Sequence, residues 1–385
     1  MTFRVTGDLL GHAALDSSGA LGKETDNKSE TDSKSMAAEK KNVFYVKYLA
    51  DEAIFTQIVG DEGSIALTRL ENDSPASVAG PVLAAAHGYQ VGASRDELAR
   101  QFHVTREFLA QCPKLLVVSS NGAGYDTVDV EACNEAGVLV VNQAGGNAQS
   151  VAEHALGMML SLSKRIVDVD KALRREGTFE RTAYKGVEVF GKTVGIIGIG
   201  NVGTKLAGMC KSALGMTVLA YDPYVGDNET AARGAKKVEL DQLLKQADFV
   251  SINCPLTTET RGMIGEAQLA MMKPTAMLVT TARGSIHDEK ALEEALRARK
   301  IAGAGLDVWE KEPPPHDHPL MAFDNVFVSP HTAGVTNDAR RNMAKIAAEQ
   351  MIAALSGERP PRMVNPEVWP AYARRFAREF GRAPG

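Results

Sequence analysis

Short apolar runs alternate with stretches of helical spacing along the chain from residue 42 onward. Apolar runs of about four to eight residues predict buried strands, and apolar residues three and four positions apart predict helices. In the first half of the chain, strands are expected at 43–49, 65–70, 115–119 and 138–142, and helices at 96–102, 128–136 and 150–165. Such an alternation predicts a small α/β unit.

The same alternation continues through the second half of the chain. Strands are expected at 194–197, 217–221, 249–253, 276–280, 304–308 and 326–329, and helices at 202–210, 288–298 and 337–355. Six or seven strands with helices between them predict a doubly wound parallel sheet, whose ligands lie outside the carboxyl ends of the strands. The last helix is expected to return to the first unit, which makes that unit discontinuous.

A strand, a glycine turn and a helix follow one another in the middle of the chain, in the order that dinucleotide binding requires. Gly198 permits the tight turn, Gly200 leaves room for a pyrophosphate, and Gly203 lets the helix lie close to the strand. The free N–H groups of the helix N-terminus favour the phosphates. Asp222 ends the next strand, where it can bind the adenosine ribose. NAD is favoured over NADP because this carboxylate repels a 2′-phosphate and residues 223–226 contain no Arg or Lys.

These patterns predict an α/β fold with two Rossmann-like doubly wound domains, the cofactor domain being inserted in a discontinuous substrate domain. Residues 1–41 are rich in Ser, Asp, Glu and Lys and are expected to form a disordered extension. Met36 precedes the first foldable sequence, so translation starting there is one hypothesis, and whether residues 1–35 belong to the natural protein stays open. The substrate domain is assigned to 42–149 and 333–366, the NAD-binding domain to 150–332, and a C-terminal tail to 367–385.

Charge and cysteine content narrow the classes of partner. The net charge of −5 includes no basic stripe or polybasic patch, so we expect a small-molecule partner rather than nucleic acid or a membrane. No apolar stretch approaches the roughly 18 residues that a membrane helix needs, and the N-terminus lacks the apolar core of a signal peptide. Cys112, Cys133, Cys210 and Cys254 are scattered without metal-ligand spacing, which predicts reduced thiols in a cytoplasmic protein and no metal site.

Three polar residues follow strands of the second predicted sheet on its ligand-binding edge: Arg283, Glu312 and His331. Hydride transfer to a 2-oxo acid requires a cation that holds the carboxylate and a proton donor at the new hydroxyl oxygen. A guanidinium pairs with a carboxylate through two hydrogen bonds, and an imidazole titrates near neutral pH. A carboxylate that accepts a hydrogen bond from the far ring nitrogen fixes the tautomer. We therefore interpret Arg283 as the clamp that holds the substrate carboxylate, His331 as the general acid and Glu312 as the carboxylate that supports His331.

Several motifs occur in order along residues 42–366: SNGAGYDTVD, SVAEHALGMML, GIIGIGNVG, CPLTTETRGMI, TTARGSIHDEKALEEAL, GAGLDVWEKEP and SPHTAG. In these motifs the chain resembles the NAD-dependent D-2-hydroxyacid dehydrogenases, the family that includes D-lactate, glyoxylate/hydroxypyruvate and phosphoglycerate dehydrogenases. The resemblance implies that Arg283, Glu312 and His331 are the catalytic residues. It also implies a homodimer joined through the NAD domain.

The resemblance further implies two sets of contacts. Backbone N–H groups of the loop Asn121, Gly122, Ala123 and Gly124, together with Arg283, would bind the substrate carboxylate. The cofactor set comprises Gly198, Gly200, Asn201, Val202, Gly203 and Asp222 at the turn and ribose, Cys254 and Pro255 beside the adenosine, and Thr281, Ala282, Arg283, Asp307, His331 and Ala333 towards the nicotinamide.

Two positions depart from the family pattern. Thr280 replaces an Asn common before the catalytic Arg, and Ser120 replaces an Arg found in phosphoglycerate dehydrogenases, which weakens the case for a phosphorylated substrate. The expected activity is NAD-dependent interconversion of a small 2-oxo acid and its D-2-hydroxy acid. The alternatives are phosphoglycerate dehydrogenase, a formate dehydrogenase-like enzyme, against which Glu312 argues, and an NAD(H)-sensing protein like the related corepressors. The identity of the 2-hydroxy acid and the physiological direction stay open.

Overall fold

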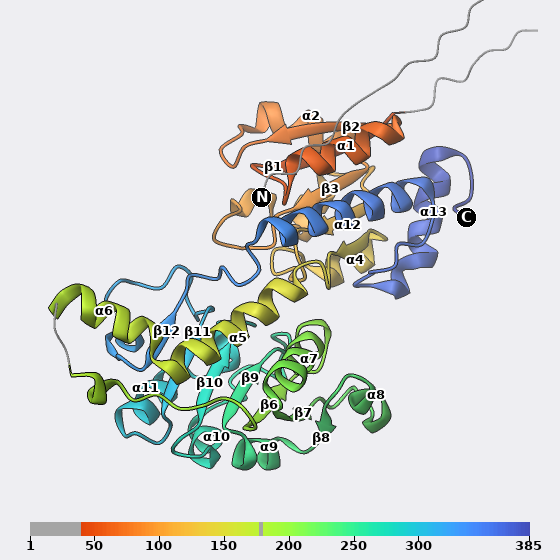
Figure 1. The fold of residues 1–385 in the computed structure, drawn as a ribbon. Coiled ribbons are helices and arrows are strands. Elements are labelled where there is room, and N and C mark those ends of the chain that lie inside the picture. Colours follow the sequence, from red (N-terminus) through yellow and green to blue (C-terminus); the bar gives the residue numbers. More distant parts are fainter. Residues whose placement is uncertain (1–39, 177–179) are drawn as a thin grey trace, which may run out of the picture. The chain divides into compact units, whose positions relative to one another are not determined.

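The computed structural model describes residues 40–176 and 180–385, and two all-parallel β-sheets form the framework of this part of the chain (Figure 1). The first sheet has the strand order β2-β1-β3-β4-β5, and the second has the order β12-β11-β10-β9-β6-β7-β8. Each order reverses direction once, between β1 and β3 and between β6 and β9, as in doubly wound sheets. The strands are β1 Lys41–Val46, β2 Ile65–Leu70, β3 Gly88–Val91, β4 Val117–Ser120, β5 Leu139–Asn142, β6 Thr193–Ile197, β7 Thr217–Tyr221, β8 Lys236–Lys237, β9 Phe249–Ile252, β10 Met277–Thr280, β11 Gly303–Leu306 and β12 Val326–Val328.

Helices cover both faces of the second sheet. On one face, α5 packs against β10 to β12 and α7 packs against β6 and β7, around a core that includes Met158, Leu206 and Ile196. On the other face, α9, α10 and α11 contribute a second core of leucines. The helices of the described residues are α1 Glu52–Glu62, α2 Ala76–Ala85, α3 Arg106–Ala110, α4 Val130–Ala136, α5 Ala148–Lys164, α6 Ile166–Glu176, α7 Asn201–Leu214, α8 Asp227–Ala232, α9 Leu240–Gln246, α10 Glu266–Met271, α11 Glu289–Arg297, α12 Asn337–Ser356 and α13 Trp369–Phe380.

Helix α12 follows the last strand of the second sheet, yet it packs on the first sheet beside α1 (Figure 1). The small side chains of Ala344, Ala347 and Ala348 let it approach closely, and they lie in one buried cluster with Tyr45 and Phe55. The chain therefore leaves the first domain, builds the second and returns. This arrangement confirms the expected fold class of two Rossmann-like domains, one inserted in the other.

The helix expected at 96–102 is wrong, because only a single 3-10 turn forms, at Arg100–Phe102. The reason is a side chain far along the chain. Asn72 donates its amide to the carbonyl of Glu97 at 2.8 Å and accepts the N–H of Ala99 at 3.0 Å. These bonds occupy backbone groups that a helix would use itself, so the tertiary contact overrides the local spacing.

The C-terminal segment also differs from the simple tail assigned to 367–385. Residues Trp369–Phe380 form α13, whose Tyr372 and Phe376 are fully buried against the first sheet. Its Glu379 pairs with His87 at 3.1 Å and with Lys114 at 2.8 Å. The segment is therefore an integral layer of the first domain.

The expected elements do not include α1, α2, α3, α6, α8, α9, α10, β3 or β8. Helices α1 and α2 have weak apolar spacing, and the strands β3 and β8 are short. The expected N-terminal extension lies outside the described residues up to position 39, and Lys41 already belongs to β1. The finer domain boundaries stay predictions. Within 40–176 and 180–385, every helix is too short or too polar to cross a membrane.

Candidate active site

The glycine turn lies between the carboxyl end of β6 and the start of α7. Gly198 has φ +90°, and a Cβ there would lie 2.7 Å from the backbone nitrogen of Cys254. A Cβ on Gly203 would overlap the carbonyl oxygen of Gly198, so both positions need glycine. At Gly200, by contrast, a Cβ would meet no atom within 4 Å. The backbone therefore presents an open surface at the helix N-terminus.

Helix α7 begins without a side-chain cap, so its first N–H groups are left for an anion. Asp222 follows β7 and accepts the N–H of Ile199 at 3.1 Å and of Tyr224 at 3.0 Å, which fixes it beside the turn. Buried oxygens at Asn253 and Thr281, at the ends of β9 and β10, have no partner in the described structure. An open cradle, a fixed carboxylate and unpaired polar atoms along one edge fit a dinucleotide.

Arg233 is a neighbour of this turn that the sequence analysis misses. Its guanidinium donates to the carbonyl of Ile199 at 2.5 Å and pairs with Glu229. Residues 223–226 contain no cation, whereas Arg233 follows α8. The signal would have been the single Arg at the end of the helix after Asp222.

Cys254 lies beside the same turn, where the sequence analysis expects the adenosine. Burial raises the pKa of its thiol to about 11. The thiol therefore stays neutral at physiological pH and forms an apolar wall rather than a nucleophile.

His331 and Glu312 form a hydrogen-bonded pair, as the sequence analysis expects of a general acid and its support. The His331 Nδ1 atom lies 2.7 Å from the Glu312 Oε2 atom, and Glu312 Oε1 accepts the N–H of Trp309 at 3.1 Å. Burial raises the pKa of Glu312, but the hydrogen bond and charge of His331 outweigh it, assisted by the Trp309 N–H and Arg283, so this pKa is below its ordinary value. An ionised carboxylate only accepts, so Nδ1 carries a proton and Nε2 is left for chemistry.

Arg283 lies against the predicted substrate loop. Its Nη2 atom is 3.2 Å from the Asp126 Oδ2 atom, and its Nη1 atom donates to the carbonyl of Ala282 at 2.7 Å. A Cβ on Gly124 would overlap the guanidinium. The structure thus brings the predicted clamp, the loop and the His331–Glu312 pair together. Asp126, which the sequence analysis misses, follows the loop by two residues and occupies the guanidinium.

The loop 121–124 offers fewer free N–H groups than expected. The N–H of Asn121 donates to the carbonyl of Val91 at 2.8 Å, and that of Gly122 donates to Gln143 Oε1 at 2.5 Å. Asn142 holds the carbonyl of Ala123 at 2.8 Å. The N–H groups of Ala123 and Gly124 take part in none of the hydrogen bonds found in the described residues, and they are the pair left for a substrate carboxylate.

Asp307 and Ala333 lie behind His331. Asp307 is fully buried, and its carboxylate accepts the N–H of Ala333 at 2.9 Å. The two residues, both predicted to contact the cofactor, are therefore hydrogen-bonded to each other. Two histidines in the loop after Glu312 are not part of the cluster: His318 lies 3.1 Å from Glu289, and His316 is exposed.

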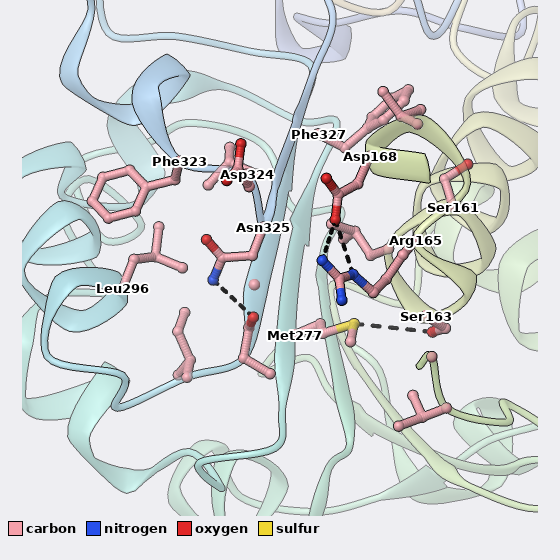
Figure 2. Close-up of a pocket in the computed structure, with 18 of the residues that line it drawn as sticks. Ser161, Ser163, Arg165, Asp168, Met277, Leu296, Phe323, Asp324, Asn325 and Phe327 are labelled. Atoms are coloured by element: carbon pink, nitrogen blue, oxygen red, sulfur yellow. Dashed lines mark hydrogen bonds and ion pairs between the residues drawn. The ribbon is translucent and has the colours of Figure 1, made fainter. Parts of the chain in front are cut away.

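A cavity of about 660 Å³ lies at the opposite edge of the second sheet (Figure 2). Its wall includes Met277, Gly303 and Val326, the first residues of β10, β11 and β12. Arg283, Asp307 and His331 follow the last residues of these strands. The cavity is therefore separate from the candidate active site.

Substituting Gly124 by Ala should disable the site while the fold is kept. The new methyl group would displace the flexible end of Arg283 rather than backbone, and a misplacement of about 1 Å lowers turnover by roughly a hundredfold. Steady-state kinetics with a 2-oxo acid measure the effect. Gly60→Ala, at a helical site with no atom within 4 Å, is the matched control. Equal activity of the two variants would contradict the contact.

The fold and the glycine turn define an NAD-binding protein of the doubly wound class. Residues 156–333 match the family model described as D-isomer specific 2-hydroxyacid dehydrogenase, NAD binding domain. The chain is 40% identical over 269 residues to a glyoxylate reductase of Korarchaeum cryptofilum, which covers 69% of this chain and 80% of that protein. The chain belongs to the D-isomer specific 2-hydroxyacid dehydrogenase family.

Other relatives carry different names. The chain is 41% identical over 280 residues to a D-3-phosphoglycerate dehydrogenase of Archaeoglobus fulgidus, covering 70% of this chain. It spans about half the length of such relatives, 53% in this case. A D-lactate dehydrogenase from Aquifex aeolicus complexed with NAD and lactic acid superposes with a TM-score of 0.71 at 27% identity, covering 84% of this chain and 99% of that one. A glyoxylate reductase from Paecilomyes thermophila superposes with a TM-score of 0.74 at 26% identity, covering 85% and 99%.

These comparisons confirm the family, the fold class and NAD as the cofactor. The roles of the individual residues stay predictions.

Proposed function

We propose that the protein is an NAD-dependent oxidoreductase that interconverts a small 2-oxo acid and its D-2-hydroxy acid. The observation that carries the proposal is the His331–Glu312 pair at 2.7 Å, close enough to Arg283 for the guanidinium to lower the pKa of Glu312. Clamp, proton donor and its carboxylate support meet at one strand edge. This is the set that reduction of a 2-oxo acid requires.

Each group has a task that its contacts support. Arg283 exchanges its contact with Asp126 for the substrate carboxylate, which also accepts the N–H groups of Ala123 and Gly124. With Nδ1 bound to Glu312, the protonated His331 donates from Nε2 to the substrate oxygen. The ionised Glu312 stabilises the imidazolium before the transfer and orients the ring throughout.

The cofactor is held at the neighbouring strand ends. The open backbone at Gly200 and the uncapped start of α7 receive its pyrophosphate, and Asp222 binds the adenosine ribose. When bound, NADH supplies the hydride that reduces the carbonyl. Asp222 disfavours a 2′-phosphate, although the guanidinium of Arg233 also lies beside the turn.

A panel of 2-oxo acids tests the activity and the substrate class. NADH oxidation is followed with glyoxylate, hydroxypyruvate, pyruvate, phenylpyruvate and 3-phosphohydroxypyruvate. We expect turnover of the small unphosphorylated acids, because Ser120 places no cation at the end of β4 for a phosphate. Preference for 3-phosphohydroxypyruvate would contradict the substrate class. Turnover of none of the five, with tight NADH binding, would contradict the enzymatic function and favour a sensing role.

We further propose that the protein is a homodimer joined through the NAD domain. Large apolar side chains are exposed on and after α6: Ile166 (54%), Leu173 (53%), Val187 (46%) and Phe190 (74%). Exposed apolar side chains of this size in one segment of the chain are typical of an interface. The free thiols of all four cysteines and the use of NAD support the expected cytoplasmic location.

The dimer gives a direct prediction. Replacing Ile166 and Leu173 together by Glu introduces charge into the apolar surface of α6, so the molecular mass in sedimentation should fall from that of a dimer to that of a monomer. Val78→Glu, at a residue 53% exposed on α2, is the control and should leave the dimer intact. A dimer that survives the double substitution would place the interface elsewhere.

A further inference from the structure

The backbone at His331 is held in an unusual conformation by a buried carboxylate. His331 has φ +56°, a left-handed conformation that is uncommon for residues other than glycine. Its N–H donates to the carbonyl of Asp307 at 2.6 Å, and the Asp307 carboxylate accepts the N–H of Thr332 at 2.8 Å and of Ala333 at 2.9 Å. Asp307 therefore holds the backbone of residues 331–333 in this conformation.

This carboxylate has a further donor in Ser329. The Ser329 hydroxyl donates to Asp307 Oδ1 at 2.5 Å. A hydroxyl has one proton, so this bond commits it, and the Ser329 oxygen is left as an acceptor. The Ser329 carbonyl accepts the indole N–H of Trp309 at 3.1 Å, which fixes the residue at both ends.

His154 supplies the donor that Ser329 Oγ accepts. Its Nε2 atom lies 3.0 Å from Ser329 Oγ and 3.8 Å from Asp307 Oδ1. Because the hydroxyl proton already points to Asp307, Nε2 must carry the hydrogen. His154 lies on α5, the long helix packed against β10, β11 and β12. A chain of hydrogen bonds thus runs from His154 on α5 through Ser329 to the Asp307 carboxylate.

The chain matters because an ionised carboxylate without access to water is costly unless it is fully hydrogen-bonded. Donors in series polarise one another and strengthen the last bond. Without the His154 N–H, the Ser329 oxygen loses its donor, and the bond to Asp307 alone orients the hydroxyl. The hydrogen bond from Ser329 to Asp307 is then weakened, and Asp307 holds the left-handed backbone at His331 less firmly.

We propose that His154 is a positioning residue for the catalytic histidine, acting through Ser329 and Asp307. This inference rests on the proposed role of His331. His154 touches neither the substrate nor the reacting atoms. Its contacts make the geometry of the general acid depend on a helix of the NAD domain.

The test compares substitutions that remove or keep the N–H donor. His154→Leu should lower kcat by about 10- to 100-fold, with the KM for the 2-oxo acid and the dissociation constant for NADH changed less than about twofold. His154→Gln keeps a donor and should recover most of kcat. Glu153→Gln, at an exposed neighbour on α5 whose carboxylate accepts a hydrogen bond from Gln149, should change nothing. Equal losses in the Leu and Gln variants would overturn the proposal.

A double-mutant cycle with Ser329→Ala separates a chain from two independent effects. If His154 acts through the hydroxyl, His154→Leu should reduce kcat much less in the Ser329→Ala background than in the original protein. Fully additive losses would overturn the proposal, even if His154→Leu alone proves unstable in part. Faster amide exchange at residues 331–334 in both single variants is the expected readout without substrate. Full activity of His331→Gln would contradict the proposed function itself. This outcome distinguishes a failure of the proposed function from a failure of the positioning role of His154.

Discussion

His331→Gln is expected to lower kcat for a 2-oxo acid by about a thousandfold, while the dissociation constant for NADH changes less than about twofold. Glutamine is similar in length and still reaches Glu312, but its amide delivers no proton at neutral pH. The substitution leaves the proposed cofactor contacts of the glycine turn and Asp222 untouched. Steady-state kinetics and fluorescence titration with NADH measure the two quantities.

The control is His316→Gln, which makes the same chemical change at an exposed histidine of the loop after Glu312. It should keep kcat within about twofold. Arg283→Ala should raise the KM of the 2-oxo acid and lower kcat together, because the proposed role of the guanidinium is to bind the carboxylate and polarise the carbonyl. Turnover near the original value in both His331→Gln and Arg283→Ala would remove the basis for a hydride-transfer function.

The part of the site that could be predicted from the sequence is the part fixed by strand ends. The buried runs before Arg283, Glu312 and His331 locate the carboxyl ends of parallel strands, and parallel strands bring those ends to one edge. The glycine turn could be predicted for the same reason, since its chemistry lies within one strand, one turn and one helix. In these cases local pattern and global fold agree.

The residues that escaped prediction are those whose partners are remote along the chain. Asp126 lies 157 positions from Arg283, and His154 lies 175 positions from Ser329. Neither spacing leaves a signal in a single sequence, because both contacts exist only after two segments are packed. The failed helix at 96–102 has the same cause, since Asn72 reaches its backbone from outside the segment. What the sequence conveys is local; the partner of each side chain follows from topology.

A buried histidine unrelated to the proposed chemistry gives the second large effect. His287 is 1% exposed at the end of the turn after Arg283, and neither of its ring nitrogens has a partner in the described structure. Burial lowers its pKa to about 4, although the charges of Glu289 and Asp288 oppose the shift. The unfolded chain binds the proton near pH 6.5. The part of the unfolding free energy that depends on neutral His287 is therefore fully present above about pH 6.5. It is lost as the pH falls towards 4, because the unfolded state then binds more protons than the folded state.

His287→Leu should remove this part of the pH dependence. A shift from 6.5 to about 4 corresponds to about 3 kcal/mol of unfolding free energy lost on acidification. Urea unfolding at pH 7.5 and pH 4.5 measures it: the original protein should lose about 2 to 3 kcal/mol more than the Leu variant, which should lie within about 1 kcal/mol of it at pH 7.5. Carboxylates such as Glu379 also weaken the fold in acid, but they act equally in both proteins and cancel. Exposed His316→Leu should keep the full loss. Parallel curves for His287→Leu and the original protein would mean that His287 takes up its proton without unfolding, by reaching water or a carboxylate that the native packing keeps away.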